Sequence, residues 1–322
     1  MVEGTWITAD ELNAGRSLAL GVVSIIMATY NRAATLPRAV DSVLRQDYAK
    51  WELIIVDDGS TDETEQILKG LRDPRIIVVR HERNRGVTAA KNSGLDCIGG
   101  EWFTFVDSDD EILPESLSAM LAVVARHPDV NAVTCNCRDT LTGGLSGTGL
   151  HHDGYIDFEA VARTGGAHWG ITRTELLGPL RFDERISGFE GVVWLKISAR
   201  ARRYYLDQPL KIYHREGGDR VCQKNQDPGR SSSNYLHLAE DREYLDLLRR
   251  GDRAAYSQTV FQICRACVDA HRRSDAWRFY GCYEGPATRK AFLFSACLLG
   301  PRWASLVAKF EAAAPRPSRP AR

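Results

Sequence analysis

The stretch ELIIVDDGSTD, from Glu52 to Asp62, is an apolar run that ends in two carboxylates and a turn. The apolar part, Glu52–Val56, has the length and the β-branched content of a strand. Asp and Gly next to each other mark a turn at the end of such a run. The stretch therefore predicts a strand whose carboxyl end carries the polar groups Asp57, Asp58 and Ser60.

Strands and helices alternate on both sides of this stretch. Strand-like runs of five or six residues are separated by helical patterns of ten or more, which is typical of βαβ units and a parallel sheet. The predicted strands are Val22–Met27, Glu52–Val56, Arg75–Val79, Trp102–Val106 and Val130–Cys135, and the predicted helices are Ala34–Leu44, Thr61–Leu71, Val87–Ile98 and Pro114–Arg126. We therefore expect an α/β fold with a mostly parallel, Rossmann-like sheet flanked by helices.

Polar residues follow four of these strands, at the point where each strand ends. In a parallel sheet, right-handed crossovers bring the loops after the strands to one edge, where ligands bind. The sequence therefore predicts a binding site at this edge. Its candidate residues are Thr29, Tyr30, Asn31, Arg32, Asp57, Asp58, His81, Glu82, Arg83, Asn84, Asp107, Ser108, Asp109 and Asp110.

The carboxylates in two of these loops suggest what the site binds. Asp107 to Asp110 reads DSDD and offers the hard oxygen ligands that Mg²⁺ and Mn²⁺ share with substrate phosphates. One carboxylate of Asp57-Asp58 could accept hydrogen bonds from a base or a ribose, and Thr29 to Asn31 could face a base or a phosphate. Each motif alone also fits an ordinary polar turn.

Three common nucleotide and hydrolase motifs are absent from the sequence. No GxGxxG follows the first strand, and the chain has no phosphate-binding GxxxxGK[ST] loop. No GxSxG nucleophile elbow is present either. These absences disfavour a dinucleotide-binding enzyme, a P-loop protein and an α/β-hydrolase.

The motifs in residues 22–125 together resemble the inverting glycosyltransferases of family two, which have the GT-A fold. The resemblance rests on VSIIMATYNR at 23–32, ELIIVDDGSTD at 52–62, NRG at 84–86 with AKNSG at 90–94, and VDSDD at 106–110 followed by Pro114. It implies that Thr29 and Asp58 contact the nucleotide and that Lys91 approaches the diphosphate. Asp107 would face the nucleoside or the metal shell, and Asp109 would bind Mn²⁺ or Mg²⁺.

The second half of the chain resembles this family more loosely. Phe182-Asp183-Glu184 is similar to the family's FDE, and WLKI at 194–197 is similar to its WLRL. Counting back from WLKI places Glu190 where the family has its catalytic Asp, with Phe189 in place of the preceding Glu. Glu190 is thus the candidate general base. His214 is a candidate metal ligand, with a structural histidine as the alternative.

The resemblance implies transfer of a sugar from a nucleotide-diphosphate sugar to an acceptor hydroxyl, in one metal-dependent displacement. A UDP-sugar is the favoured donor, and a glycan, a lipid-linked sugar or a small molecule remains open as the acceptor. The departure at Phe189 keeps open a catalytically inactive nucleotide-sugar-binding module. A nucleotidyltransferase is a further alternative, which the lack of Gly in Ala28–Ala33 disfavours.

Composition and hydropathy predict the partners and the location of the protein. The 42 Lys and Arg balance the 42 Asp and Glu, so no global positive field attracts nucleic acid. No signal peptide or membrane-spanning run is expected, which predicts a cytoplasmic protein whose C-terminal helix could rest on a membrane.

We expect a leader (1–20), a catalytic domain (21–220) with a nucleotide-sugar half (21–137) and an acceptor half (138–220), a helical region (221–311) and a disordered tail (312–322).

Overall fold

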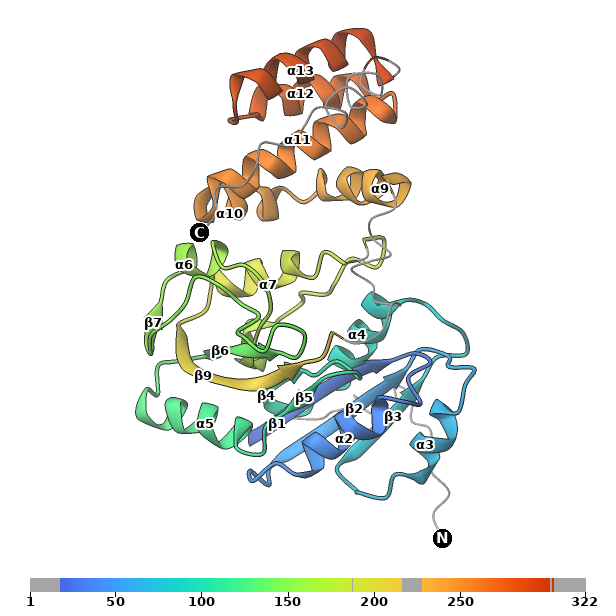
Figure 1. The fold of residues 1–322 in the computed structure, drawn as a ribbon, viewed down its shortest axis with the longest axis vertical. Coiled ribbons are helices and arrows are strands. Elements are labelled where there is room, and N and C mark those ends of the chain that lie inside the picture. Colours follow the sequence, from blue (N-terminus) through green and yellow to red (C-terminus); the bar gives the residue numbers. More distant parts are fainter. Residues whose placement is uncertain (1–17, 187, 216–227, 302, 304–322) are drawn as a thin grey trace. The chain divides into compact units, whose positions relative to one another are not determined.

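The computed structural model describes residues 18–186, 188–215, 228–301 and 303 (Figure 1). Contacts within the chain divide it into two compact units, residues 1–221 and 222–322, and each unit is described here by itself. The predicted disordered tail and most of the predicted leader lie outside the described residues. The last two residues of that leader belong to the first strand, which begins at Ala19.

The first half of the first unit is the predicted parallel sheet. Four strands lie in the order β3-β2-β1-β4, and every neighbouring pair among them is parallel. Each strand is followed by a helix or by a loop that leads to one, as the alternating pattern predicts. These elements are β1 (Ala19–Thr29), α2 (Leu36–Leu44), β2 (Trp51–Asp57), α3 (Thr64–Gly70), β3 (Ile76–Arg80), α4 (Val87–Asp96), β4 (Gly100–Phe105) and α5 (Ser116–Arg126).

The second half of the sheet is mixed, and sequence periodicity did not reveal its order. The sheet continues from β4 through β8-β6-β9-β5, with β7 paired to β9. The predicted fifth strand, β6, is not the neighbour of β4, because β8 pairs antiparallel to both strands and lies between them. The elements of this half are β5 (Glu111–Ile112), β6 (Ala132–Asp139), β7 (Gly154–Ile156), α6 (Phe158–Ala162), β8 (His168–Arg173), η1 (Thr174–Leu176), α7 (Gly191–Ser198) and β9 (Arg203–Tyr213).

The sheet is covered by helices on both faces. Alternate residues of a strand point to opposite faces, and Ile25 and Ile55 pack in one core while Ile26 and Ile54 pack in the other. The first core includes α2, α3 and α5, and the second includes α4 and α7. Because β1 and β2 are buried on both faces, their polar groups can reach a ligand only from the strand ends.

The second unit is built from helices, in keeping with the helical pattern of the sequence. Its helices are α9 (Pro228–Leu238), α10 (Arg242–Gly251), α11 (Arg253–Asp269), α12 (Arg273–Cys282) and α13 (Ala287–Leu299). Asp241 and Asp252 begin α10 and α11 by accepting hydrogen bonds from backbone amides of the first turn. In the described part of the chain, no helix combines the length and apolar character needed to cross a membrane.

The close approach of α4 to β1 depends on Gly94. A Cβ atom added at Gly94 would lie 2.4 Å from Cγ2 of Ile26, a buried side chain that has little room to move. We expect Gly94→Ala to destabilise the protein by about 1–3 kcal/mol, because an extra carbon in a packed core forces side chains or backbone to shift. Thermal unfolding followed by circular dichroism measures the effect.

Gly70→Ala in α3 is the matched control. No atom lies within 4 Å of a Cβ added there, so the same chemical change should leave the melting temperature unchanged or raise it. Equal melting temperatures for the two variants would contradict the packing argument.

Candidate functional site

The loops after β1, β2 and β3 meet at one edge of the sheet, as predicted, and Asp58 holds two of them together. Its carboxylate is buried and accepts hydrogen bonds from the backbone amides of Arg85 (2.9 Å) and Gly86 (2.7 Å). Nδ1 of His81 lies 2.7 Å from the same carboxylate. Asp58 was predicted to contact the nucleotide, and in the structure its oxygens order the loop that precedes α4.

The loop after β1 is fixed in the same way. Asn31 adopts a left-handed backbone conformation with φ of 51°, and its Oδ1 accepts a hydrogen bond of 2.8 Å from the amide of Thr61. Thr29 is buried, and its Oγ1 has no hydrogen-bond partner among the described residues. A buried hydroxyl without a partner is costly, so Thr29 is the residue of this loop best placed to gain from a ligand.

The carboxylate of Asp107, at the end of β4, lies between two lysines. Its Oδ1 is 3.5 Å from Nζ of Lys91 on α4, and its Oδ2 is 3.4 Å from Nζ of Lys211 on β9. Partial burial raises the pKa of Asp107, but the two ammonium groups outweigh this effect and hold it well below its ordinary value. Asp107 is therefore an anion at neutral pH, and it joins the two halves of the sheet.

Lys91 connects this carboxylate to the candidate base. Its Nζ lies 2.8 Å from both carboxylate oxygens of Glu190, which precedes α7. Burial lowers the pKa of Lys91, but the charges of Glu190 and Asp107 more than compensate, and the pKa lies above that of an ordinary lysine. The structure thus brings together three residues singled out from the sequence, although Glu190 and Lys91 are 99 positions apart.

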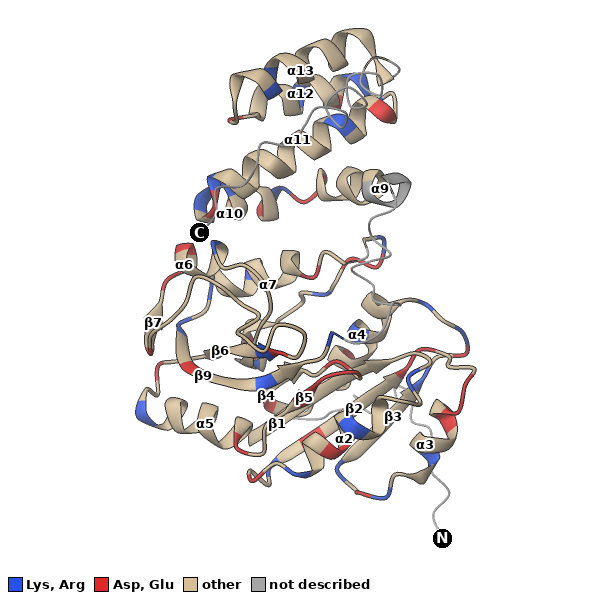
Figure 2. Ribbon diagram, in the orientation of Figure 1, with Lys and Arg blue, Asp and Glu red and all other residues tan. Residues whose placement is uncertain are grey.

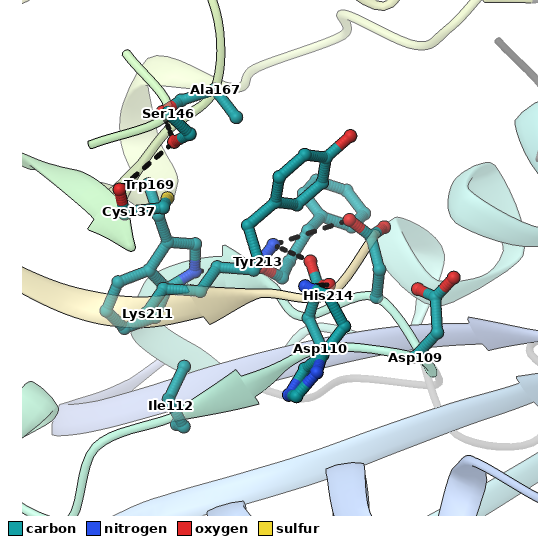
Figure 3. A network of polar contacts seen from close by, with 12 residues as sticks. Asp109, Asp110, Ile112, Cys137, Ser146, Ala167, Trp169, Lys211, Tyr213 and His214 are labelled. Atoms are coloured by element: carbon teal, nitrogen blue, oxygen red, sulfur yellow. Dashed lines mark hydrogen bonds and ion pairs between the residues drawn. The ribbon is translucent and has the colours of Figure 1, made fainter. Parts of the chain in front are cut away.

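Lys211 is part of the same network and was not predicted from the sequence. Its buried Nζ lies 2.7 Å from Oδ2 of Asp110, as the close view shows (Figure 3). Burial raises the pKa of Asp110 to about 6, helped by the charge of Asp107 and opposed by that of Lys211. A lysine between Leu210 and Ile212 in a strand was the one sequence signal for this contact.

His214, the second candidate metal ligand, is held against the loop that carries Asp109. Nε2 of His214 lies 2.8 Å from Glu111, its backbone amide donates to Asp110, and the Asp109 and His214 side chains point in different directions (Figure 3). The carboxylate of Asp109 has no ion pair with a described residue. Across residues 18–186, 188–215, 228–301 and 303, no three His, Cys, Asp or Glu side chains form a group that could hold a metal ion.

Asp109 nevertheless suits a cation that is shared with a substrate. Mg²⁺ is commonly bound through one or two carboxylates together with substrate phosphates, rather than by a cage of protein ligands. A partly exposed carboxylate beside the anionic Asp107 provides such a ligand. His214 as a second ligand stays a prediction, and its contact with Glu111 fits the structural alternative as well.

Comparison with known proteins agrees with this geometry. The family described as "Glycosyl transferase family 2" matches residues 24–155, which include the ends of β1, β2 and β4 and the Asp107–Asp110 loop. This chain carries a family 2 glycosyl transferase domain. Its candidate site therefore lies where the domain's matched loops meet, with Glu190 and Lys211 added from residues beyond the match.

Two curated relatives extend the comparison. A GalNAc(5)-diNAcBac-PP-undecaprenol beta-1,3-glucosyltransferase of Campylobacter jejuni is 32% identical over 201 residues, which are 59% of this chain and 64% of the relative. A UDP-Glc:alpha-D-GlcNAc-diphosphoundecaprenol beta-1,3-glucosyltransferase of Escherichia coli is 35% identical over 106 residues, or 33% of this chain and 42% of the relative. This chain thus spans less than two thirds of the length of either relative.

A solved structure confirms the predicted GT-A fold. The crystal structure of S. aureus TarS 1–349 in complex with UDP-GlcNAc superposes with a TM-score of 0.69 at 20% identity. The match covers 90% of this chain and 91% of that chain. At this identity the likeness concerns the fold, which includes the mixed sheet and the helices after it.

The raised pKa of Asp110 predicts a pH dependence of stability. Because its pKa rises from 3.8 in the unfolded chain to about 6 in the folded protein, its stabilising contribution is complete below pH 3.8. That contribution is lost as the pH rises through about 6. We expect Asp110→Asn, which mimics the protonated acid, to gain melting temperature relative to wild type as the pH rises from 3.8 through about 6.

Asp129→Asn is the control for this measurement. The pKa of Asp129 is lowered, mainly by a hydrogen bond from Tyr155, so its titration falls below the same pH window. If wild type and Asp110→Asn show parallel melting curves across the window, Asp110 does not titrate as inferred.

Proposed function

We propose that this chain is an inverting glycosyltransferase that transfers a sugar from a UDP-sugar to a hydroxyl of a lipid-linked acceptor. The observation that carries the proposal is the pairing of Glu190 with Lys91 beside Asp107, at the strand ends of a family 2 domain. UDP-GlcNAc is bound by TarS, and both relatives named above are glucosyltransferases whose names include an undecaprenol-linked sugar. These likenesses support the donor and acceptor classes proposed here.

Glu190 is the proposed general base. Its side chain is about one-third exposed, which leaves it accessible to an acceptor hydroxyl while Lys91 fixes the position of both its oxygens. Removal of the hydroxyl proton by the carboxylate would let the oxygen attack the anomeric carbon as the bond to the diphosphate breaks. A single displacement of this kind inverts the anomeric centre.

Lys91 is proposed to link donor binding to the release of this base. Its ammonium group is already shared between Glu190 and Asp107. A donor diphosphate at the strand ends would compete for the same ammonium group and thereby weaken its hold on Glu190. Lys211 would keep Asp107 and Asp110 neutralised during this exchange, because it pairs with both carboxylates.

Asp109 is proposed to hold Mn²⁺ or Mg²⁺ together with the donor diphosphate. The bound cation would stabilise the negative charge that develops on the leaving phosphate oxygen. Thr29 and Asn31 are proposed to line the nucleotide end of the site, where the unpartnered hydroxyl of Thr29 can form a hydrogen bond with the base. Asp58 would act there by ordering the loop before α4.

Glu190→Gln tests the proposed base. The amide keeps the size of the side chain but cannot accept the proton, so we expect transfer to fall by about 10²–10⁴-fold while UDP binding is retained. Transfer is measured as UDP released in the presence of a lipid-linked acceptor, and binding is measured by calorimetry. Glu175→Gln, which changes an exposed acid in the same unit, is the matched control.

The same measurements distinguish a glycosyltransferase from an inactive nucleotide-sugar-binding module. Wild-type transfer with an inactive Glu190→Gln variant supports the glycosyltransferase. UDP binding without transfer by wild type, across a panel of UDP-, GDP- and dTDP-sugars and acceptors, would instead favour an inactive binding module.

Asp109→Asn tests the proposed metal ligand. Loss of the carboxylate should weaken the Mn²⁺-dependent binding of UDP at least tenfold, whereas metal-independent binding should change little. Calorimetry with and without Mn²⁺ measures both quantities. Asp62→Asn, in the loop after β2, is the control, since its carboxylate accepts hydrogen bonds from the amides of Ala33 and Thr64. Equal Mn²⁺ dependence in wild type and Asp109→Asn would exclude Asp109 as a ligand.

A further inference from the structure

The exposed large apolar side chains of the described residues are concentrated near the end of the second unit. Five of the twelve lie between residues 277 and 303, although this segment is a small part of the chain. They are Trp277, Phe294, Leu298, Leu299 and Trp303, with exposed fractions from 37% to 57%. Scattered exposed apolar residues need no explanation, but a concentration of them marks an interaction site.

Four side chains of α12 and α13 form one continuous patch, which we call the aromatic face: Trp277, Tyr280, Phe294 and Leu298. The ring of Phe294 lies 5.6 Å from that of Trp277 and 5.9 Å from that of Tyr280. The rings of Trp277 and Tyr280 are 5.5 Å apart. Leu298 follows Phe294 by one helical turn and therefore lies on the same side of α13.

The opposite side of α13 is already used for packing. Phe292, Leu293, Ala296 and Cys297 are buried, so they form the inner side of this helix within the unit. From Ala291 to Leu299 the helix carries no charged residue at all. A stretch of helix that is apolar on all sides is normally buried or in contact with lipid. The exposed aromatic face of this stretch is therefore expected to contact something other than water.

Basic side chains border the aromatic face. Nη2 of Arg273 donates a hydrogen bond to the carbonyl of Leu298, and Nζ of Lys290 lies 5.7 Å from the ring centre of Tyr280. Residues 272–301 contain five basic residues and two acidic ones, and Figure 2 shows Lys and Arg on both α12 and α13. This part of the chain is positively charged although the whole chain is neutral.

We infer that the aromatic face docks on the surface of an anionic lipid bilayer. Trp and Tyr are enriched at membrane–water interfaces, where their rings lie at the level of the head groups, and Lys and Arg beside them attract anionic lipids. Aromatic residues and arginine are enriched in protein interfaces as well, so self-association through this face is tested below as the competing outcome. The inference goes beyond the proposed function and would bring the enzyme to the membrane that holds a lipid-linked acceptor.

Vesicle binding tests the inference without any sugar chemistry. The full chain is mixed with vesicles of phosphatidylcholine, with or without phosphatidylglycerol, and the bound fraction is measured by co-sedimentation. Wild type should bind the anionic vesicles and lose this binding as salt is added. Phe294→Ser with Leu298→Ser should weaken binding at least tenfold, because two side chains that would be buried at the bilayer surface are replaced by polar ones.

Two variant pairs serve as matched controls. Leu20→Ser with Leu141→Ser removes two exposed leucines of the first unit, at 81% and 71% exposure, and should leave vesicle binding unchanged. Arg273→Gln with Lys290→Gln should lower binding to anionic vesicles at least tenfold, because basic residues near the surface attract anionic lipids. Arg72→Gln with Arg126→Gln, which makes the same change in net charge on the first unit, should not.

Three results would overturn the inference. They are absence of binding by wild type, equal binding by the face variants and wild type, and a wild-type dimer that the Phe294→Ser, Leu298→Ser variant abolishes in analytical ultracentrifugation. UDP binding by the same samples is measured in parallel. Vesicle binding without UDP binding would contradict the proposed function alone, and UDP binding without vesicle binding would contradict this inference alone.

Discussion

The candidate site depends on one arrangement of charges, in which the carboxylate of Asp107 lies between Lys91 and Lys211. Lysine is rarely buried unless it is paired, and both ammonium groups here are largely removed from water. Their placement is therefore tolerated only because carboxylates from the loop after β4 and from the residue before α7 surround them. Loss of the Asp107 carboxylate would remove a partner from both lysines at once, which is destabilising for charges that are largely removed from water.

The fold provides this arrangement through its sheet. Parallel strands β1, β2 and β3 bring their following loops to one edge, and Asp58 binds the loop that starts α4. The helix then carries Lys91 to the end of β4, where Asp107 lies. From the other side, β9 pairs with β5 directly after the Asp107–Asp110 loop, which brings Lys211 and His214 to the same carboxylates. Both halves of the sheet are thus needed for one site.

The pairing of Lys91 with Glu190 gives the site a physical means of ordering its events. The ammonium group of Lys91 contacts both Glu190 and Asp107. A further anion that enters the site would compete with these carboxylates for the same ammonium group. In the proposed function that anion is the donor diphosphate, so the donor would bind before the acceptor hydroxyl meets a fully available base. The second unit is described by itself, and the inference drawn from its aromatic face is independent of this network.

The sequence by itself determined the parallel half of the sheet, the loops that meet at its edge, and the candidate residues Asp107, Lys91 and Glu190. The sheet, the loops and Asp107 follow from local periodicity and strand-end position, whereas Lys91 and Glu190 follow from the resemblance to family two. Only the tertiary structure decided that β8 lies between β4 and β6, that Lys211 joins the DSDD loop, and that His214 pairs with Glu111. It also showed that Trp277 and Phe294 share one exposed face. The physical reason is that these contacts join elements distant in sequence, and burial, which sets their energies, is a property of the packed chain rather than of any segment.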